Sequence, residues 1–154
     1  MIDIEVGDTA WTGALADAQA LVLAACEATL ASEGAVGEGV SLLLTDDSAV
    51  RDLNRRFRQQ DKPTNVLSFP APQNPERFLG DVALAYGVCA REAHEQGKSL
   101  AHHLQHLVAH GVFHLLGYDH ETDAQAEEME SLERAVLAEL GIPDPYAAGP
   151  KSAG

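Results

Sequence analysis

The stretch His110-Gly-Val-Phe-His114-Leu-Leu-Gly117-Tyr-Asp-His120 predicts the end of a helix and, at the same place, three imidazoles that can meet. His110 and His114 are four residues apart, so on a helix they share one face, with Cβ atoms about 5–6 Å apart. Gly117 follows the apolar run, where a glycine can adopt the left-handed conformation that ends a helix. The chain can then turn so that His120 returns toward the first two histidines.

Such a cluster suits a metal ion. Imidazoles bind zinc at about 2.0–2.1 Å, and three protein ligands leave a fourth position for water, as in catalytic zinc sites. Zinc lowers the pKa of that water toward about 7. We therefore predict one Zn²⁺ ion per chain, held by His110, His114 and His120 and used for hydrolysis. Nickel, copper and iron also accept imidazole ligands.

An earlier pair of histidines could share a helix face as well, because four of them repeat every four residues: His102, His106, His110 and His114. We favour the last pair, since it alone lies beside the Gly117 turn and His120. The other histidines of this segment are expected at the surface or behind the metal ligands: His102, His103 and His106.

The spacing H-x-x-x-H-x-x-G-x-x-H is also that of metzincin metalloproteases. In those enzymes a glutamate follows the first histidine and acts as the general base, whereas this chain has Gly111. A glycine cannot take a proton, so a peptidase would lack its main catalytic group. A peptidase-like metallohydrolase with another substrate is retained as an alternative.

The rest of the chain predicts a single α+β domain over residues 1–142, with a loose tail over 143–154. Alternating or continuous apolar runs predict four short strands, over residues 2–6, 39–45, 64–69 and 80–85. Helical spacing and capping residues predict about five helices, over residues 14–32, 46–57, 87–96, 99–116 and 122–140. Residues 59–63 and 70–78 are expected to be irregular connections.

Composition indicates an ordinary globular protein, with 154 residues of which 45% are hydrophobic and 22% charged. No apolar stretch is long enough to cross a bilayer, and the N-terminus lacks the basic and apolar parts of a signal peptide. Cys26 and Cys89 lie among alanines and leucines, which favours reduced core residues over a disulfide or metal ligands. These features together predict a cytoplasmic protein.

The charge distribution is uneven. The net charge of −14 argues against a polyanionic partner. Half of the ten lysines and arginines nevertheless fall between positions 51 and 62: Arg51, Arg55, Arg56, Arg58 and Lys62. This segment is either a solvated helix face or a basic patch that contacts phosphates, for which local charge matters more than net charge.

With these motifs in view, the sequence resembles the YbeY family of bacterial endoribonucleases. The likeness runs from about residue 40 to 140 and rests on the histidine stretch and on four further blocks: Leu53-Asn-Arg-Arg-Phe-Arg58, Asp61 to Pro70, Leu79-Gly-Asp-Val82, and the helix with Glu128, Met129 and Glu133. Over the first 35 residues only the pattern of a strand followed by a helix matches.

The resemblance implies an α+β fold, a zinc ion on the three histidines and a functionally important arginine at Arg58. It also implies a role in ribosome quality control and in maturation of rRNA, notably the 3′ end of 16S rRNA. The expected partners are RNA, bound through the basic cluster Arg51–Lys62, and ribosomal particles or ribosome-associated proteins, with no membrane.

Several roles stay open at this point. Arg58 would clamp a phosphate oxygen, or else form a surface ion pair. Asp81 would orient a ligand histidine, or else be structural. Strand residues would line a groove or only support the sheet: Thr64, Asn65 and Ser68. No general base is assigned, and a non-catalytic, zinc-stabilised ribosome assembly factor is the main rival to a nuclease.

Overall fold

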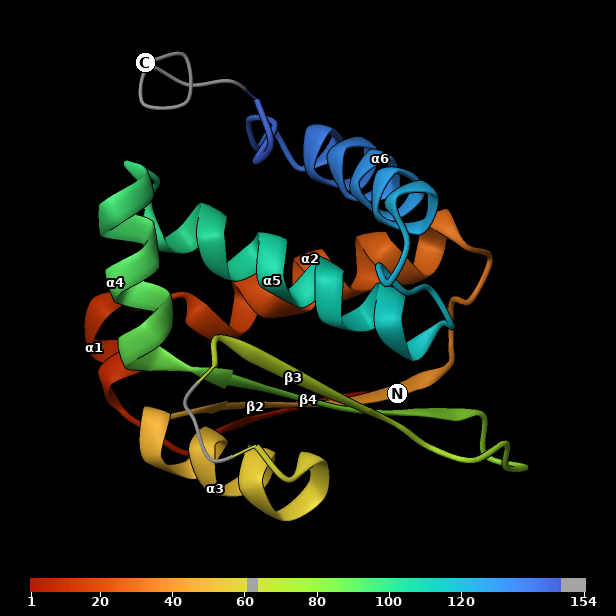
Figure 1. The fold of residues 1–154 in the computed structure, drawn as a ribbon, viewed down its shortest axis with the longest axis horizontal. Coiled ribbons are helices and arrows are strands. Elements are labelled where there is room, and N and C mark those ends of the chain that lie inside the picture. Colours follow the sequence, from red (N-terminus) through yellow and green to blue (C-terminus); the bar gives the residue numbers. More distant parts are fainter. Residues whose placement is uncertain (61–63, 148–154) are drawn as a thin grey trace.

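The computed structural model describes residues 1–60 and 64–147, in which four strands form one sheet and six helices surround it (Figure 1). The strands are β1 (Ile2–Val6), β2 (Gly39–Thr45), β3 (Val66–Pro70) and β4 (Phe78–Ala85). The helices are α1 (Ala10–Ala14), α2 (Ala18–Ser32), α3 (Asp47–Arg58), α4 (Tyr86–Gln96), α5 (Leu100–Leu115) and α6 (Asp123–Glu139). The α+β class predicted from the sequence is confirmed.

The sheet has the order β1-β2-β4-β3 and is mixed. β1 and β4 each pair with β2 in parallel, whereas β3 pairs with β4 in antiparallel fashion and forms one edge. Strand β3 ends at Pro70, which we expected to lie just beyond the strand. A proline cannot donate to a sheet ladder, and an edge strand is where that loss is tolerated.

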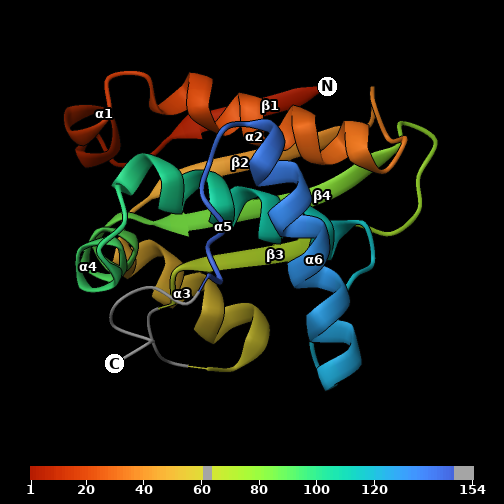
Figure 2. The same cartoon turned by 90° about the horizontal axis from the view of Figure 1, so that it is seen from above.

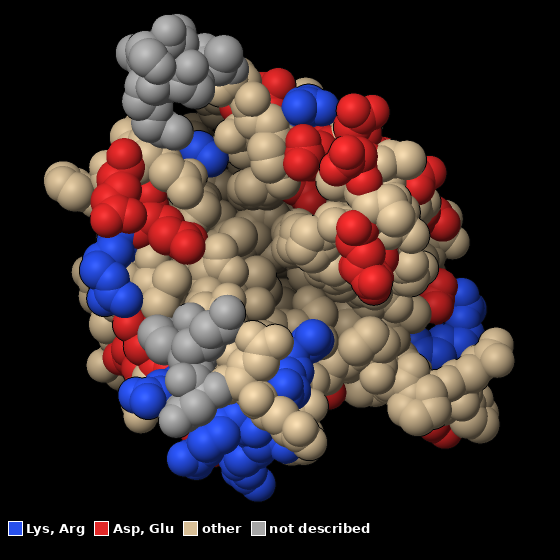
Figure 3. Space-filling model, in the orientation of Figure 1, with Lys and Arg blue, Asp and Glu red and all other residues tan. Residues whose placement is uncertain are grey.

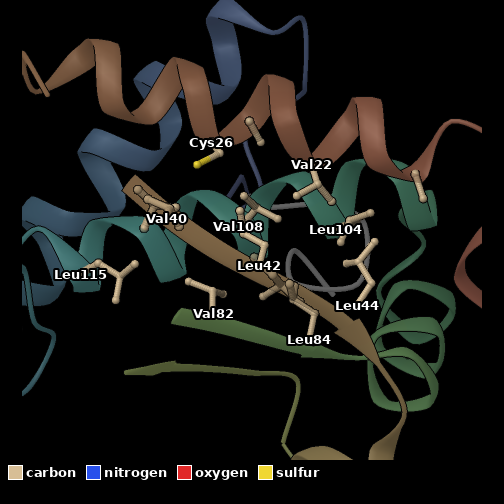
Figure 4. Packing of buried hydrophobic residues seen from close by; sticks show 14 of the residues in the cluster. Val22, Cys26, Val40, Leu42, Leu44, Val82, Leu84, Leu104, Val108 and Leu115 are labelled. Carbon is tan, nitrogen blue, oxygen red and sulfur yellow. The ribbon is translucent and has the colours of Figure 1, made fainter. Parts of the chain in front are cut away.

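The helices form layers on both faces of the sheet (Figures 1 and 2). On one face α2 and α5 cover the sheet, and Val82 and Leu84 of β4 point into this main core with Val22, Val108 and other apolar residues (Figure 4). On the other face α3 packs through Val50 against the alternate residues of the strands. Helix α6 lies outside α5 and buries Phe113, Met129 and Val136 against it.

The predicted capping signals are present. The Asp46 carboxylate accepts a hydrogen bond from the Ala49 N–H at 2.7 Å and starts α3. Thr122 and Gln125 form the reciprocal capping box that starts α6. The helix predicted over residues 14–32 is wrong at its start, because a short helix α1 ends at Ala14 and α2 begins only at Ala18.

Both cysteines are free and buried, as predicted, and burial raises the pKa of Cys26 to about 12.

Residues 143–147, at the start of the segment expected to be loose, make specific contacts: Arg134 pairs with Asp144 at 3.1 Å and the Lys98 ammonium donates to the Pro145 carbonyl at 3.1 Å. Residues 148–154 of that segment lie outside the described residues. Within the described ranges, no helix has the length and apolar character needed to cross a membrane.

Candidate metal centre

The C-terminal end of α5 places two histidines on one face and then reverses the chain. The N–H groups of Leu116, Gly117 and Tyr118 bond back to carbonyls of the last turn, and Gly117 takes the left-handed φ of 105° that the sequence predicted. Tyr118 fixes the position of the turn, because its hydroxyl donates to Glu33, the residue after α2, at 2.7 Å and its ring contacts Phe113. The turn therefore returns His120 to the helix in a defined position.

The structure brings His110, His114 and His120 together, with one ligand atom from each lying within 4.8 Å of the others. The Nε2 atoms of His110 and His114 are 3.2 Å apart. Two imidazole nitrogens on a tetrahedral zinc, each at about 2.0–2.1 Å, are separated by about 3.3 Å. The cluster is therefore of the right composition and size for a metal ion.

Electrostatics keep the middle histidine in the form that binds metal. Burial, followed by the neighbouring imidazoles of His110 and His120, lowers the pKa of His114 below its ordinary value. At neutral pH this imidazole is neutral and one of its nitrogens has a lone pair to offer. His120 is the most open of the three, with 55% of its side chain exposed.

A buried carboxylate, Glu133 of α6, lies directly behind the cluster. Its Oε2 is 2.8 Å from His110 Nδ1 and its Oε1 is 2.7 Å from His106 Nε2. The Tyr146 hydroxyl donates to the same Oε1 at 2.5 Å. The Glu133 side chain is fully buried, and its hydrogen bonds with these three groups compensate for the lost hydration of the carboxylate.

These contacts decide the protonation of Glu133. Burial by itself raises the pKa of Glu133, but the hydrogen bonds from His106 and His110 together outweigh it and lower the pKa to about 2. An ionised carboxylate only accepts hydrogen bonds, so the His110 proton sits on Nδ1. The lone pair of His110 is then on Nε2, the atom that faces His114.

The sequence left open whether Asp81 orients a ligand histidine or is structural, and the structure places it away from the cluster. Asp81 is exposed and lies on the sheet face that α3 covers, next to Ala83 in the alternation of β4. The signal for Glu133 was present: it falls four residues after Met129 and shortly before Val136, on the buried stripe of α6. A charged residue on an otherwise apolar stripe indicates a buried partner.

The earlier histidines of α5 are not surface residues, apart from the half-exposed His102. His103 is buried and bonds to Glu92 at 2.9 Å, and burial lowers its pKa. His106 is buried and shares Glu133 with His110. Of the predicted positions, His106 thus lies behind the candidate ligands, while His103 belongs to a separate contact with α4.

The three histidines open into a cavity of about 490 Å³. Arg58, Asn65 and Ser68 line it with them, whereas Thr64 is not among its lining residues. Figure 3 shows this face of the molecule hollowed at its centre, with basic residues gathered below the hollow, over α3. Lys62, the last residue of the predicted basic cluster, lies outside the described residues.

Arg58 reaches the cavity from the opposite side of the sheet. It is the last residue of α3, and its guanidinium donates to the Ser68 carbonyl of β3 and lies 5.5 Å from the Phe69 ring centroid. This path is open because β3 is an edge strand. Arg55 and Arg56 differ, since both pair with Asp52 on the exposed face of α3.

Gly111 has no room for a side chain. A Cβ at this position would lie 2.8 Å from Val82 Cγ1 and 3.2 Å from Ser68 Oγ, because α5 packs directly on β3 and β4 here. A glutamate after the first histidine, as in the metzincins, would therefore displace the helix that holds the cluster.

We predict that Gly111→Ala destabilises the metal-free protein by about 1–2 kcal/mol. Overpacking costs about 1–3 kcal/mol, which exceeds the gain of up to about 1 kcal/mol that alanine normally brings to a helix. Urea unfolding measures the change. Gly13→Ala is the matched control, because nothing lies within 4 Å of its added Cβ, and it should not destabilise. An equally stable Gly111→Ala protein would contradict the close packing of α5.

Comparison with known proteins places this geometry in a family. The family model described as Endoribonuclease YbeY matches residues 5–141. A protein of that name from Azorhizobium caulinodans is 54% identical over 153 residues, which cover 95% of this chain and 96% of that protein. One from Rhodopseudomonas palustris (strain BisB18) is 52% identical over 141 residues, covering 86% and 84% of the two chains. One from Nitrobacter winogradskyi is 58% identical over 116 residues, covering 70% and 61%.

The fold has a counterpart among solved structures. The solution structure of a Thermotoga maritima protein superposes with a TM-score of 0.59 at 25% identity, covering 96% of this chain and 99% of that one. The matched family model spans the end of β1, the other three strands, the histidine turn and α6. On this likeness over nearly its whole length, the chain belongs to the YbeY family of endoribonucleases.

Proposed function

We propose that this protein is a single-strand-specific, zinc-dependent endoribonuclease that acts in the cytoplasm. Its proposed roles are maturation of rRNA, at the 3′ end of 16S rRNA, and ribosome quality control, in contact with ribosomal particles or ribosome-associated proteins. The observation that supports the catalytic part most directly is one cavity lined by His110, His114, His120 and Arg58. Metal ligands and a phosphate-binding cation side by side suit phosphodiester cleavage, because both offset negative charge on the reacting phosphate.

Each group in the cavity has a distinct task in this proposal. Bound zinc would supply Lewis acidity and lower the pKa of a nearby water toward about 7. Glu133 keeps the His110 proton on Nδ1 and so leaves Nε2 for the metal. The Arg58 guanidinium binds a phosphate oxygen and offsets the negative charge that develops there. The groove beside β3 admits a single strand whose bases are not paired.

The proposal is tested by offering the zinc-loaded and the metal-stripped chain single-stranded RNA, duplex RNA, peptides and nucleotides. We expect cleavage of single-stranded RNA that disappears with the metal and returns when zinc is restored. Cleavage of a peptide instead would favour the other metallohydrolase reading. RNA binding without any cleavage, together with lower stability after metal removal, would favour the zinc-stabilised assembly factor.

Arg58→Ala is expected to lower kcat for RNA cleavage about 100-fold while the zinc content stays at one ion per chain. A donor aimed at developing charge is worth about 2.7–4 kcal/mol in comparable sites, and the lower end of this range is about 100-fold. Arg58→Lys should recover only part of the rate, because an ammonium cannot bind bidentately. The control is Arg55→Ala, which changes an exposed arginine of the same helix that is paired with Asp52. An unchanged rate in Arg58→Ala would leave this arginine as a structural contact of β3.

A further inference from the structure

A second cavity adjoins the histidine cluster, toward the N-terminal half of α5. It has a volume of about 400 Å³ and shares the lining residues Asn65, Val66 and His110 with the metal cavity, so the two lie side by side. Its walls come from the start of β3, the end of α4, the middle of α5 and residues 145–146. Figure 1 shows α4, α5 and β3 converging at this place.

The α4 wall offers hydrogen-bonding groups that have no partner in the part of the chain that the structure describes. Glu92 Oε1 accepts from Asn65 Nδ2 at 3.0 Å and bonds to His103 Nε2 at 2.9 Å, while Glu92 Oε2 has no hydrogen bond among the described residues. Gln96, one turn later, is half-buried, and its amide likewise bonds to none of the described residues. The wall therefore presents a fixed acceptor beside a group that can both donate and accept.

Other residues of the lining supply aromatic surface and positive charge. The Tyr146 and His106 rings meet edge to face with centroids 5.2 Å apart, and both line the cavity. The Lys98 ammonium, which donates to the Pro145 carbonyl, adds a cation to the wall. Apolar contact comes from Val66 and Leu107.

This combination fits a nucleobase. A volume of a few hundred Å³ is that of a small-ligand site with mostly preformed walls. Proteins that bind single-stranded RNA splay bases into such pockets, hold them against aromatic rings and bond to their edges. A carboxylate accepts from the N–H groups of a base. Because His110 lies between the two cavities, a base held here belongs to a nucleotide beside the phosphate at the metal cavity.

We propose that the cavity between α4, α5 and β3 is a base-binding subsite, in which Glu92 and Gln96 bond to the edge of one nucleobase next to the scissile phosphodiester. The subsite rests on the proposed RNA substrate but not on cleavage itself. It makes binding depend on one particular base of the strand, whereas Arg58 and the histidines contact groups common to every nucleotide.

The test measures binding of 2′-O-methyl hexanucleotides of mixed sequence, which cannot be cleaved through their 2′-hydroxyls, to the zinc-loaded protein by fluorescence anisotropy. Each hexamer has an abasic residue at a different position. A bound base is worth about 1–3 kcal/mol, so we expect one abasic position to weaken binding about tenfold in the wild-type protein. In Gln96→Ala and Glu92→Gln, we expect weaker binding of the intact strand. The further loss of affinity caused by that one abasic position should then be less than about twofold. Glu95→Gln, at an exposed position of the same helix, should match the wild type.

The outcomes separate this proposal from the proposed function. RNA that is cleaved but shows no position-specific loss, or shows the same loss in Gln96→Ala, overturns the subsite and leaves the nuclease standing. RNA that is bound with the expected loss but never cleaved supports the subsite and overturns the nuclease. No RNA binding at all overturns both. Glu92 also bonds to His103, so Glu92→Gln could unfold the protein. In that case the position-specific loss in Gln96→Ala alone tests the subsite.

Discussion

His114→Ala is expected to lose both its zinc and its RNA cleavage. The side chain of His114 lies close to both other histidines. Its Nε2 is 3.2 Å from that of His110, and its ring centroid is 4.9 Å from that of His120. Removing it leaves two ligands, one of them on an exposed turn. Lewis-acid stabilisation is worth several kcal/mol, so kcat/KM should fall about 1,000-fold or more. Zinc per chain by mass spectrometry and cleavage of a single-stranded RNA measure the two effects.

His102→Ala is the matched control for this prediction. His102 belongs to the same helix and the same four-residue repeat, yet it lines neither the metal cavity nor its neighbour. Its replacement should leave both zinc content and cleavage unchanged. Full cleavage by metal-free His114→Ala would end the proposal of a catalytic metal, whatever the protein then proved to do.

Local patterns account for most of the fold that could be predicted. Strands β1 and β2 occupy exactly the predicted residues, because alternation and apolar runs are properties of a few adjacent side chains. The caps of α3 and α6 are equally local. The order β1-β2-β4-β3 and the break before Ala18 were not predictable in this way, since both depend on packing between segments far apart in the chain.

The same distinction holds for the site. The spacing of His110, His114 and His120 predicted their convergence, because one helix and one turn contain all three. Glu133 is 23 residues from His110, and only the packing of α6 on α5 brings them together. Arg58 comes from the other side of the sheet and depends on the edge position of β3. The sequence could therefore name the metal cluster, whereas the apolar stripe of α6 marked Glu133 as a buried charge without showing which residues it contacts.

The charge distribution is compatible with an RNA partner despite the net charge of −14. Figure 3 shows acidic residues over α6 and beside α4, and basic residues over α3 below the central hollow. A phosphate backbone responds to the charges within about 10 Å, since salt screens those farther away. A strand that enters along α3 would thus meet cations, while the acidic surface of α6 would oppose its approach from that side.

Glu133 is the residue through which we expect the protein to tune its metal affinity. It accepts from His110, His106 and Tyr146, and the low pKa of about 2 keeps it an acceptor at every physiological pH. A glutamine has nearly the same shape but presents an NH₂ group on one side. That group would face an imidazole N–H, so one histidine must move its proton to the other nitrogen. If His110 does so, the lone pair leaves the nitrogen that faces His114.

We therefore expect Glu133→Gln to weaken zinc binding about 10- to 100-fold, the usual effect of losing a group that orients a metal ligand. At saturating zinc kcat should return close to the wild-type value, because the change concerns ligand orientation and not the substrate. Zinc affinity is measured by competition with a chelator, and the ¹⁵N shifts of the His110 ring report its tautomer in the metal-free protein. Glu127→Gln, at an exposed position of the same helix, serves as control. A folded Glu133→Gln protein with unchanged zinc affinity and unchanged His110 shifts would show that the buried carboxylate supports α6 and nothing more.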